Sequence, residues 1–260
     1  MRPDPFRWLV FFCSATVLAF IFLPLVELIT EPAPSDMWES IADPDVRSAI
    51  GLSIYASAWA AFISLVLGTP LAYLLARREF RGKKLLESVV DLPIMIPHPV
   101  IGIAILSLAG AGHPLGRVLR DLGIQLMSTV TGLVVVLTFV GLPFHINAAR
   151  NGFLAVPPRL ERVSRSLGSS AAGAFFRVTL PLAWRSILTG VIMCLARAIS
   201  EFGAVVIVAY HPMTAPVMIY ERFTAYGLKY SQPVAVWLIL VSLALFALLR
   251  VVAIRRKGAA

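Results

Sequence analysis

The chain has 260 residues, of which 14% are charged and 58% are hydrophobic. A soluble globular domain carries about 25% charged residues, so this composition excludes an ordinary water-soluble fold and indicates a polytopic helical membrane protein. The formal net charge of +9 would suit nucleic acid only on a soluble basic face, and the sequence offers no soluble domain. Cys13 and Cys194 both lie in apolar stretches, which excludes a disulfide framework and a CxxC metal site.

Six apolar stretches are long enough to cross a bilayer, and we expect a helix in each. They cover residues 8–29, 50–76, 89–110, 130–148, 186–210 and 233–254. Each is continuously apolar, whereas the strands of a membrane barrel alternate, so the sequence predicts an all-α membrane domain over residues 1–260. The first stretch is too long for the core of a signal peptide and lacks an A-x-A cleavage site, which predicts a retained anchor.

The positive charges divide unevenly between the two sides of the predicted bundle. Seventeen Lys and Arg residues lie at the termini, between spans two and three, or between spans four and five, and five lie on the opposite side. The positive-inside rule then predicts that both termini are cytoplasmic. Five carboxylates between Glu31 and Asp45 gather on the first external connection, and Arg197 remains inside the fifth span.

The longest predicted cytoplasmic connection, residues 150–185, has a helical pattern of its own. Pro157 and Pro158 suit a first helical turn, and one face of the following helix would carry Leu160, Val163, Ser164 and Leu167. Gly168 would end this helix in a left-handed conformation, and Ser169 or Ser170 would cap a second short helix. Periodicity alone allows either a hairpin resting on lipid headgroups or a knob that fits a groove on a partner protein.

The residue order of this connection resembles the EAA loop of ATP-binding-cassette importer permeases, which reads E-A-A-x-x-x-G and, nine residues later, I-x-L-P. Val163 and Ser164 stand for the two alanines, Gly168 for the glycine, and residues 178–181 for the ending. The chain departs at the acid, where Arg162 stands and Glu161 comes one residue early. The resemblance implies that an ATPase-coupling site is formed by Glu161, Arg162, Val163, Ser164, Leu167, Gly168, Ser169 and Pro181.

Residues 196–206, ARAISEFGAVV, resemble the R-x-x-x-E-F-G-A signature of molybdate, tungstate and sulfate permeases, and residues 211–223 are similar to the archaeal molybdate/tungstate branch. Arg197 and Glu201 would lie one turn apart on the fifth helix and pair, because an unpaired charge in the membrane costs about 2.5 kcal/mol or more. The pair either fixes this helix against its neighbours or lines an oxyanion path. Such a path or gate would include Pro97, His98, Arg197, Ser200, Glu201 and Gly203.

Two histidines stand beside helix-breaking prolines. His98 lies between Pro97 and Pro99, and His145 follows Pro143 closely. Either histidine would bond to a carbonyl that the proline leaves free, and His98 could alternatively sense charge.

The resemblance implies a type I importer permease fold in a prokaryotic plasma membrane, in contact with lipid. It also implies a homodimer, two cytoplasmic ATPases and an external oxyanion-binding protein, with tungstate or molybdate as cargo and sulfate or thiosulfate as the alternative. No G-x-x-x-x-G-K-S/T, H-E-x-x-H or G-x-S-x-G occurs, so we expect no cofactor, metal or catalytic residue in this chain, and ATP with Mg²⁺ would belong to the ATPase. A secondary transporter or channel is the rival, but its inverted repeats or half-helices are not evident.

Overall fold

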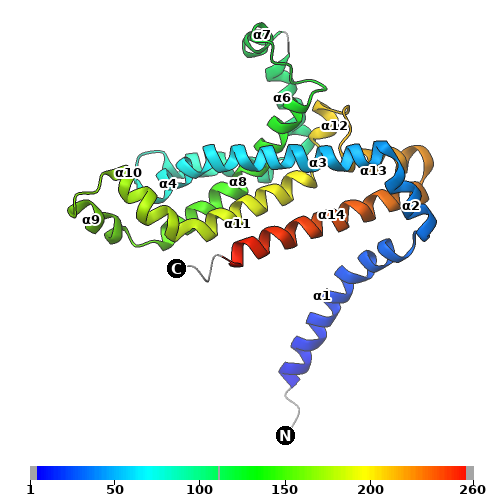
Figure 1. Ribbon diagram of the computed structural model, residues 1–260, viewed down its shortest axis with the longest axis horizontal. Coiled ribbons are helices and arrows are strands. Elements are labelled where there is room, and N and C mark those ends of the chain that lie inside the picture. The colour runs from blue at the N-terminus through cyan, green and yellow to red at the C-terminus, as the bar shows by residue number, and fades with distance from the viewer. Residues whose placement is uncertain (1–4, 111, 256–260) are drawn as a thin grey trace.

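The computed structural model describes residues 5–110 and 112–255, and every regular element in that part of the chain is a helix. Figure 1 shows long helices side by side along the molecule, two further helices projecting from one side and one helix leaving the other. The side-by-side helices are α3 (Pro44–Ile63), α8 (Val130–Ala155), α11 (Leu180–Ile199) and α14 (Leu228–Arg255). The projecting ones are α6 (His98–Ala109), α7 (Pro114–Asp121) and, on the other side, α1 (Pro5–Thr30).

Five continuous helical stretches are long and apolar enough to cross a membrane, and one bent pair of helices makes a sixth. The continuous stretches are Phe6–Thr30, Pro44–Arg77, Val130–Ala155, Ala171–Ile199 and Leu228–Val251. The all-α prediction is therefore confirmed for the described residues, and the number of spans agrees if the bent pair counts as one. Arg2, Arg256 and Lys257, which entered the charge argument, lie outside the described residues.

The third span is not the continuous helix that we expected over residues 89–110. α5 (Lys83–Met95) and α6 meet at an angle of 111°. The bend falls at Ile96 and Pro97, because a proline disfavours helical backbone in the residue before it, and Ile96 is extended with φ −82° and ψ 146°.

The fifth span also differs from the predicted range of residues 186–210. It begins earlier, through α10 (Ala171–Ala174) and the π-helical segment η2 (Phe175–Thr179), and α11 then ends at Ile199. Residues 200–204 are not helical, and a single turn follows as α12 (Val205–Val208). The prediction of an uninterrupted helix through Arg197 and Glu201 is therefore wrong.

The centre of the fold is the crossing of α8 and α11, where small residues let the two helices approach closely. A side chain at Gly141 would place its Cβ 2.5 Å from Sγ of Cys194, and one at Gly190 would lie 2.9 Å from the carbonyl oxygen of His145. Close backbone approach through small residues is how spanning helices associate without a hydrophobic drive. The crossing therefore fixes the two helices that carry most of the polar residues discussed below.

Shorter elements complete the two ends of the bundle. α3 continues through the π-helical η1 (Ser64–Gly68) into α4 (Thr69–Arg77), which ends beside α9 (Pro158–Ser166). At the other end, α2 (Pro34–Ala42) is fixed to α14 because Trp237 Nε1 donates to the carbonyl of Met37 at 3.0 Å. α13 (Ala215–Tyr226) packs on α3, and its first backbone N–H donates to Oγ of Ser53 at 2.8 Å.

Candidate functional site

The predicted coupling loop, residues 150–185, is shorter than expected because helices enter it from both sides. α8 continues to Ala155, while η2 and α11 occupy the stretch after Ala174. What remains is a hairpin of α9 and α10, residues 156–174, which we call the α9–α10 hairpin. Figure 1 shows it at one end of the long helices, with α2 and α13 at the other end.

Gly168 forms the corner of the α9–α10 hairpin, as the sequence predicts. Its φ is +91°, in the left-handed region that favours glycine. The N–H of Gly168 donates to the carbonyl of Arg165 at 3.0 Å, and that of Ser169 to the carbonyl of Ser164 at 3.1 Å, the two bonds of a Schellman ending. Ser170, the second of the two predicted caps, then accepts from the N–H of Gly173 at 3.0 Å.

Glu161 fastens the α9–α10 hairpin to two other helices. Its Oε1 accepts from Nε of Arg77 at 2.8 Å and from Oγ1 of Thr179 at 2.7 Å, and its Oε2 accepts from the hydroxyl of Tyr73 at 3.0 Å. The side chains of Arg77 and Glu161 are only 9% and 16% exposed. A charge-assisted hydrogen bond between two side chains that are so little exposed holds its geometry. The hairpin is therefore joined firmly to the ends of α4 and η2.

The carboxylate one residue before the expected position is therefore the one that faces the body of the protein. Arg162, which stands where the EAA pattern has its acid, is exposed. Burial raises the pKa of the Glu161 carboxyl, but hydrogen bonds from Thr179, Arg77 and Tyr73 outweigh this effect, so its pKa lies below the ordinary value. Sequence reasoning missed Tyr73, Arg77 and Thr179, because no local pattern links residues up to 88 positions from Glu161.

The outer face of the α9–α10 hairpin carries apolar side chains that no other part of the described chain covers. Val163 is 57% exposed and Leu167 is 83% exposed, and Leu160 is exposed as well. Ser164, which we expected on the same face, is half-buried, while Arg159 and Arg165 are exposed around the apolar residues. Pro181 lies exposed in the first turn of α11. The hairpin thus has an anchored inner side and an apolar, arginine-flanked outer side.

Arg197, Glu201 and His98 form a second polar cluster, between the end of α11 and the start of α6. Nη2 of Arg197 lies 2.5 Å from Oε2 of Glu201, and Nδ1 of His98 lies 2.7 Å from the same oxygen. Nη2 also lies 2.6 Å and 2.8 Å from the two ring nitrogens of His98. The predicted pairing of Arg197 with Glu201 is confirmed, but His98 bonds to these charged groups and not to a freed carbonyl.

The end of α11 explains how this cluster is held. Glu201 is 2% exposed, and its Oε1 accepts from the N–H of Ala204 at 2.9 Å, ahead of α12. Ser200 is exposed, and its Oγ accepts from Nη1 of Arg197 at 3.4 Å. A side chain at Gly203 would place its Cβ 3.0 Å from Cβ of His98. The glycine therefore lets the non-helical residues 200–204 lie close to the bend at Pro97. The six residues of the predicted path or gate, Pro97, His98, Arg197, Ser200, Glu201 and Gly203, therefore lie around one junction.

His145 does not bond to a freed carbonyl either. It is fully buried, and its Nε2 lies 2.9 Å from Oγ1 of Thr69, the first residue of α4. It therefore connects α8 with the start of α4. No group of three or more His, Cys, Asp or Glu side chains that could hold a metal ion occurs in residues 5–110 and 112–255.

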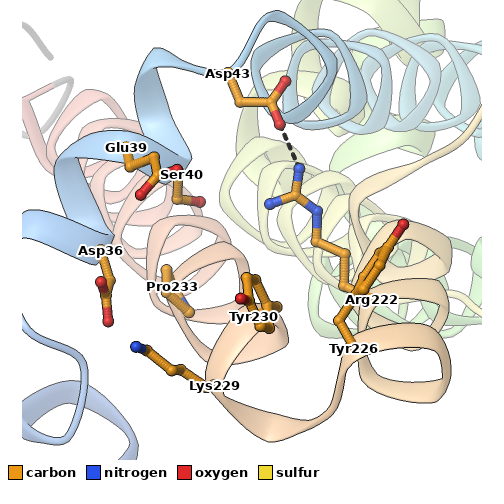
Figure 2. A pocket seen from close by; sticks show the side chains of 9 residues that line it. All are labelled: Asp36, Glu39, Ser40, Asp43, Arg222, Tyr226, Lys229, Tyr230 and Pro233. Atoms are coloured by element: carbon orange, nitrogen blue, oxygen red, sulfur yellow. Dashed lines mark hydrogen bonds and ion pairs between the residues drawn. The ribbon is translucent and has the colours of Figure 1, made fainter.

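A cavity of about 650 Å³ lies at the other end of the molecule, between α2, α13 and α14. Figure 2 shows Asp36 and Glu39 on one wall and Lys229 on the opposite wall, with its ammonium turned toward Asp36. Asp43 pairs with Nη2 of Arg222 at 2.5 Å. Burial raises the pKa of the Asp43 carboxyl, but bonds from the N–H of Asp45 and from Arg222 outweigh it, and the pKa lies below its ordinary value. The cavity is thus a solvent-open polar site of mixed charge.

Known sequences match this chain over most of its length. The family described as "Binding-protein-dependent transport system inner membrane component" matches residues 68–257. The molybdate/tungstate transport system permease protein of Methanocaldococcus jannaschii is 43% identical over 234 residues, which cover 90% of this chain and 91% of the relative. The corresponding protein of Pyrococcus abyssi is 41% identical over 236 residues, or 90% of each chain. A probable sulfate permease of Chlorokybus atmophyticus is 29% identical, with 88% and 82% covered.

Solved structures share the fold. A chain of the bacterial ABC transporter that imports the acidic polysaccharide alginate matches with a TM-score of 0.75 at 15% identity, with 96% of each chain covered. A chain of the inward-facing methionine ABC transporter matches with a TM-score of 0.63 at 17% identity, covering 87% of this chain and 98% of that one. The likeness is one of fold, and it confirms the predicted importer permease fold.

Proposed function

Since the chain belongs to the family of inner membrane components of binding-protein-dependent transport systems, we propose that it is the membrane-spanning permease subunit of an ATP-driven importer of molybdate or tungstate. Its nearly full-length likeness to molybdate/tungstate permeases at 41–43% identity supports that cargo. Sulfate or thiosulfate is the second candidate, because sulfate permeases are related at 28–29% identity. The lower identity ranks it second.

The observation that carries the proposal is the α9–α10 hairpin. Its inner side is fastened by Glu161, and its outer side leaves Val163 and Leu167 uncovered at the end of the spans. Exposed apolar side chains on a rigid support mark an interaction site, and the arginines around them suit an acidic groove. An ATPase that grips the hairpin would move α4 and η2 with it, because Glu161 bonds to both.

The assembly that we propose contains two copies of this chain, two cytoplasmic ATPases and an external binding protein. The likeness to the alginate importer, whose structure includes a substrate-bound periplasmic protein, supports this kind of assembly. ATP and Mg²⁺ would be bound by the ATPases. Closure of the ATPase pair would draw the two hairpins together and turn the path from inward-facing to outward-facing.

In this proposal both termini and the α9–α10 hairpin are cytoplasmic, in a prokaryotic plasma membrane. The division of 17 cations against five supports this orientation. A cysteine at Ser35 should then react with an impermeant thiol reagent added outside whole cells, whereas one at Arg81 should not. Reversed labelling would contradict the orientation.

We assign the junction around Arg197 to the oxyanion path. Arg197 keeps Nη1 at a weak contact of 3.4 Å with Ser200, while Glu201 is buried behind it and compensates its charge. A guanidinium held this way suits an oxyanion, because a planar fork of N–H donors matches its oxygens. A purely structural ion pair remains the alternative for this junction.

Association with the ATPase tests the role of the hairpin. Leu167→Asp places a charge on the apolar outer side and should weaken co-purification with the cognate ATPases by about tenfold or more. Leu122→Asp is the matched control, because Leu122 is a 69% exposed leucine just after α7, and it should leave association unchanged. Equal association of both variants would favour a hairpin that rests on lipid.

A further inference from the structure

A second polar feature lies along the face shared by α5, α8 and α11, and neither motif of the sequence points to it. A groove of about 350 Å³ there is lined by Asn147 and Asn151 of α8 and by Ser186 and Thr189 of α11. Ile94 and Met193 supply apolar walls. Asn151 and Thr189 are exposed, and Asn147 and Ser186 are half-buried. We call this the α8–α11 groove.

The groove and the junction at Arg197 lie on the same face of α11. On α11, the residues Ser186, Thr189, Met193 and Arg197 follow one another at spacings of three or four, so they share one face. Eleven residues separate Ser186 from Arg197, which corresponds to about 16 Å along the helix. One stripe of α11 therefore runs from the guanidinium of Arg197 past the groove.

Polar side chains on this face would be costly if it met lipid. Asn147 and Thr189 lie within stretches long and apolar enough to span a membrane, where polar groups face a bundle interior or a water-filled cavity. Asn151 and Ser186 lie directly beside Arg150 and Arg185, at the proposed cytoplasmic end of the same face. The aromatic side of α3 offers the contrast, since Tyr55, Trp59 and Phe62 stand exposed there. The two faces indicate that α3 meets apolar surroundings while the α8–α11 groove meets water.

The polar side chains of the groove are neutral amides and hydroxyls, and two of them already form hydrogen bonds within the protein. Nδ2 of Asn147 donates to Oδ1 of Asp91 at 2.7 Å, which orients the amide, and Oγ1 of Thr189 donates to the carbonyl of Arg185 at 2.9 Å. Among the described residues, none forms a hydrogen bond with the side chain of Asn151 or Ser186. The second amide hydrogen of Asn147, the amide of Asn151 and the hydroxyl of Ser186 can replace part of an anion's hydration shell, whereas the hydroxyl hydrogen of Thr189 is already donated. The carboxylate of Asp91 lies close enough to weaken anion binding, and a site on a transport path must release its ligand.

We propose that the α8–α11 groove is a transit site through which the oxyanion passes, in contact with the amide groups of Asn147 and Asn151 and the hydroxyl of Ser186, while Thr189 lines the groove beside them. The inference rests on the proposed function and adds a second site, besides Arg197, at which the permease would contact the oxyanion. No side chain that lines the groove carries a charge, so we expect the groove not to select one tetrahedral oxyanion over another by charge.

A pair of substitutions at one position tests the charge preference. Thr189→Asp and Thr189→Asn have nearly the same size, so their difference reports charge. In vesicles with the cognate ATPases and binding protein, ATP-driven molybdate uptake should be at least about tenfold slower for Asp than for Asn. Thr138→Val is the control, because Thr138 of α8 does not line the groove although its hydroxyl bonds to its own helix as that of Thr189 does, and it should leave uptake unchanged. Equal uptake by the two Thr189 variants would overturn the proposal.

Thiol labelling tests the groove without any cargo and covers the case in which Thr189→Asp fails to assemble. In the assembled complex carrying Cys13→Ala, Thr189→Cys should react with an anionic, membrane-impermeant methanethiosulfonate at least about tenfold faster than Leu67→Cys, since Leu67 is 65% exposed on the apolar stretch Pro44–Arg77. Equal rates, or a faster reaction with a cationic reagent, would overturn the assignment. Fast anionic labelling in a complex whose parent carries no oxyanion would refute the proposed cargo and support the groove as an aqueous anion path.

Discussion

Glu161 and Arg77 are 84 residues apart in the sequence, yet Oε1 of the first lies 2.8 Å from Nε of the second. The bond joins α9 of the hairpin to the last turn of α4. Thr179 donates to the same carboxylate oxygen from η2. A force applied to the hairpin therefore reaches two spanning stretches, Pro44–Arg77 and Ala171–Ile199, through one side chain.

Breaking this pair from either side should destabilise the protein. Glu161→Gln or Arg77→Met leaves one little-exposed charge without its partner, which costs about 3 kcal/mol of the free energy of unfolding. The double variant leaves no isolated charge and should be less damaged than the sum of the two single variants. Thermal unfolding of the purified protein, together with stimulated ATP hydrolysis by the assembled complex, measures both effects. Strictly additive losses would show that the two residues act independently.

The lowered pKa of the Glu161 carboxyl gives this contribution a pH dependence. A carboxyl with a lower pKa in the folded state contributes stability that is fully present above its unfolded pKa, near 4.5, and is lost as pH falls through the folded value. The stability difference between the parent and Glu161→Gln should be constant from about pH 6 to 8 and should shrink below about pH 4.5. Unfolding measured across this range checks it, and a difference that persists undiminished to about pH 3 would contradict it.

Gly168 should be sensitive to substitution although nothing surrounds it. No atom lies within 4 Å of the position of a Cβ there, so the cost arises from the backbone, about 1–2 kcal/mol for a residue held in the left-handed region. Gly168→Val should insert and dimerise normally but lose ATPase association or stimulated hydrolysis, and Gly168→Asn should be milder. Full coupling in the Val variant would show that the corner does not position the hairpin.

The hairpin shows which features local sequence chemistry can predict. The positive φ of Gly168 and the cap by Ser170 both follow from residue types within a few positions of each other, and the structure has them. The partners of Glu161 do not follow, because they depend on how α4 and η2 come to lie beside α9. A motif that places the acid at Arg162 even points to the wrong residue, since only the folded arrangement shows which side of α9 is buried.

Hydropathy predicted the spans but not their interruptions. The stretch of residues 89–110 reads as one apolar run, and its 111° bend depends on the backbone restriction that Pro97 imposes on Ile96. The break after Ile199 lies within another apolar run. There Glu201 accepts a backbone N–H from Ala204, and Gly203 packs on His98. A contact with α6, about 100 residues away, is not visible in the local pattern.

The contact between Arg197 and Glu201 predicts how substitutions at either residue affect assembly and transport. Arg197→Met and Glu201→Gln should each impair assembly or transport, because each leaves a charge without compensation, and the double variant should lose less than the sum. Glu201→Gln should still accept from the N–H of Ala204 through its amide oxygen, so the break itself should survive. Yields of assembled complex and uptake in vesicles measure the two effects separately. Additive losses would mean that the two charges act separately.

Uptake by the reconstituted complex tests the central claim most directly. Vesicles that contain this chain with its cognate ATPases and external binding protein should accumulate labelled molybdate or tungstate only when ATP is present on the side of the membrane where the ATPases lie. An excess of unlabelled tungstate should suppress molybdate uptake, and the same excess of sulfate should not. Uptake that proceeds without ATP, or that sulfate suppresses as strongly as tungstate does, would contradict an ATP-driven molybdate/tungstate permease.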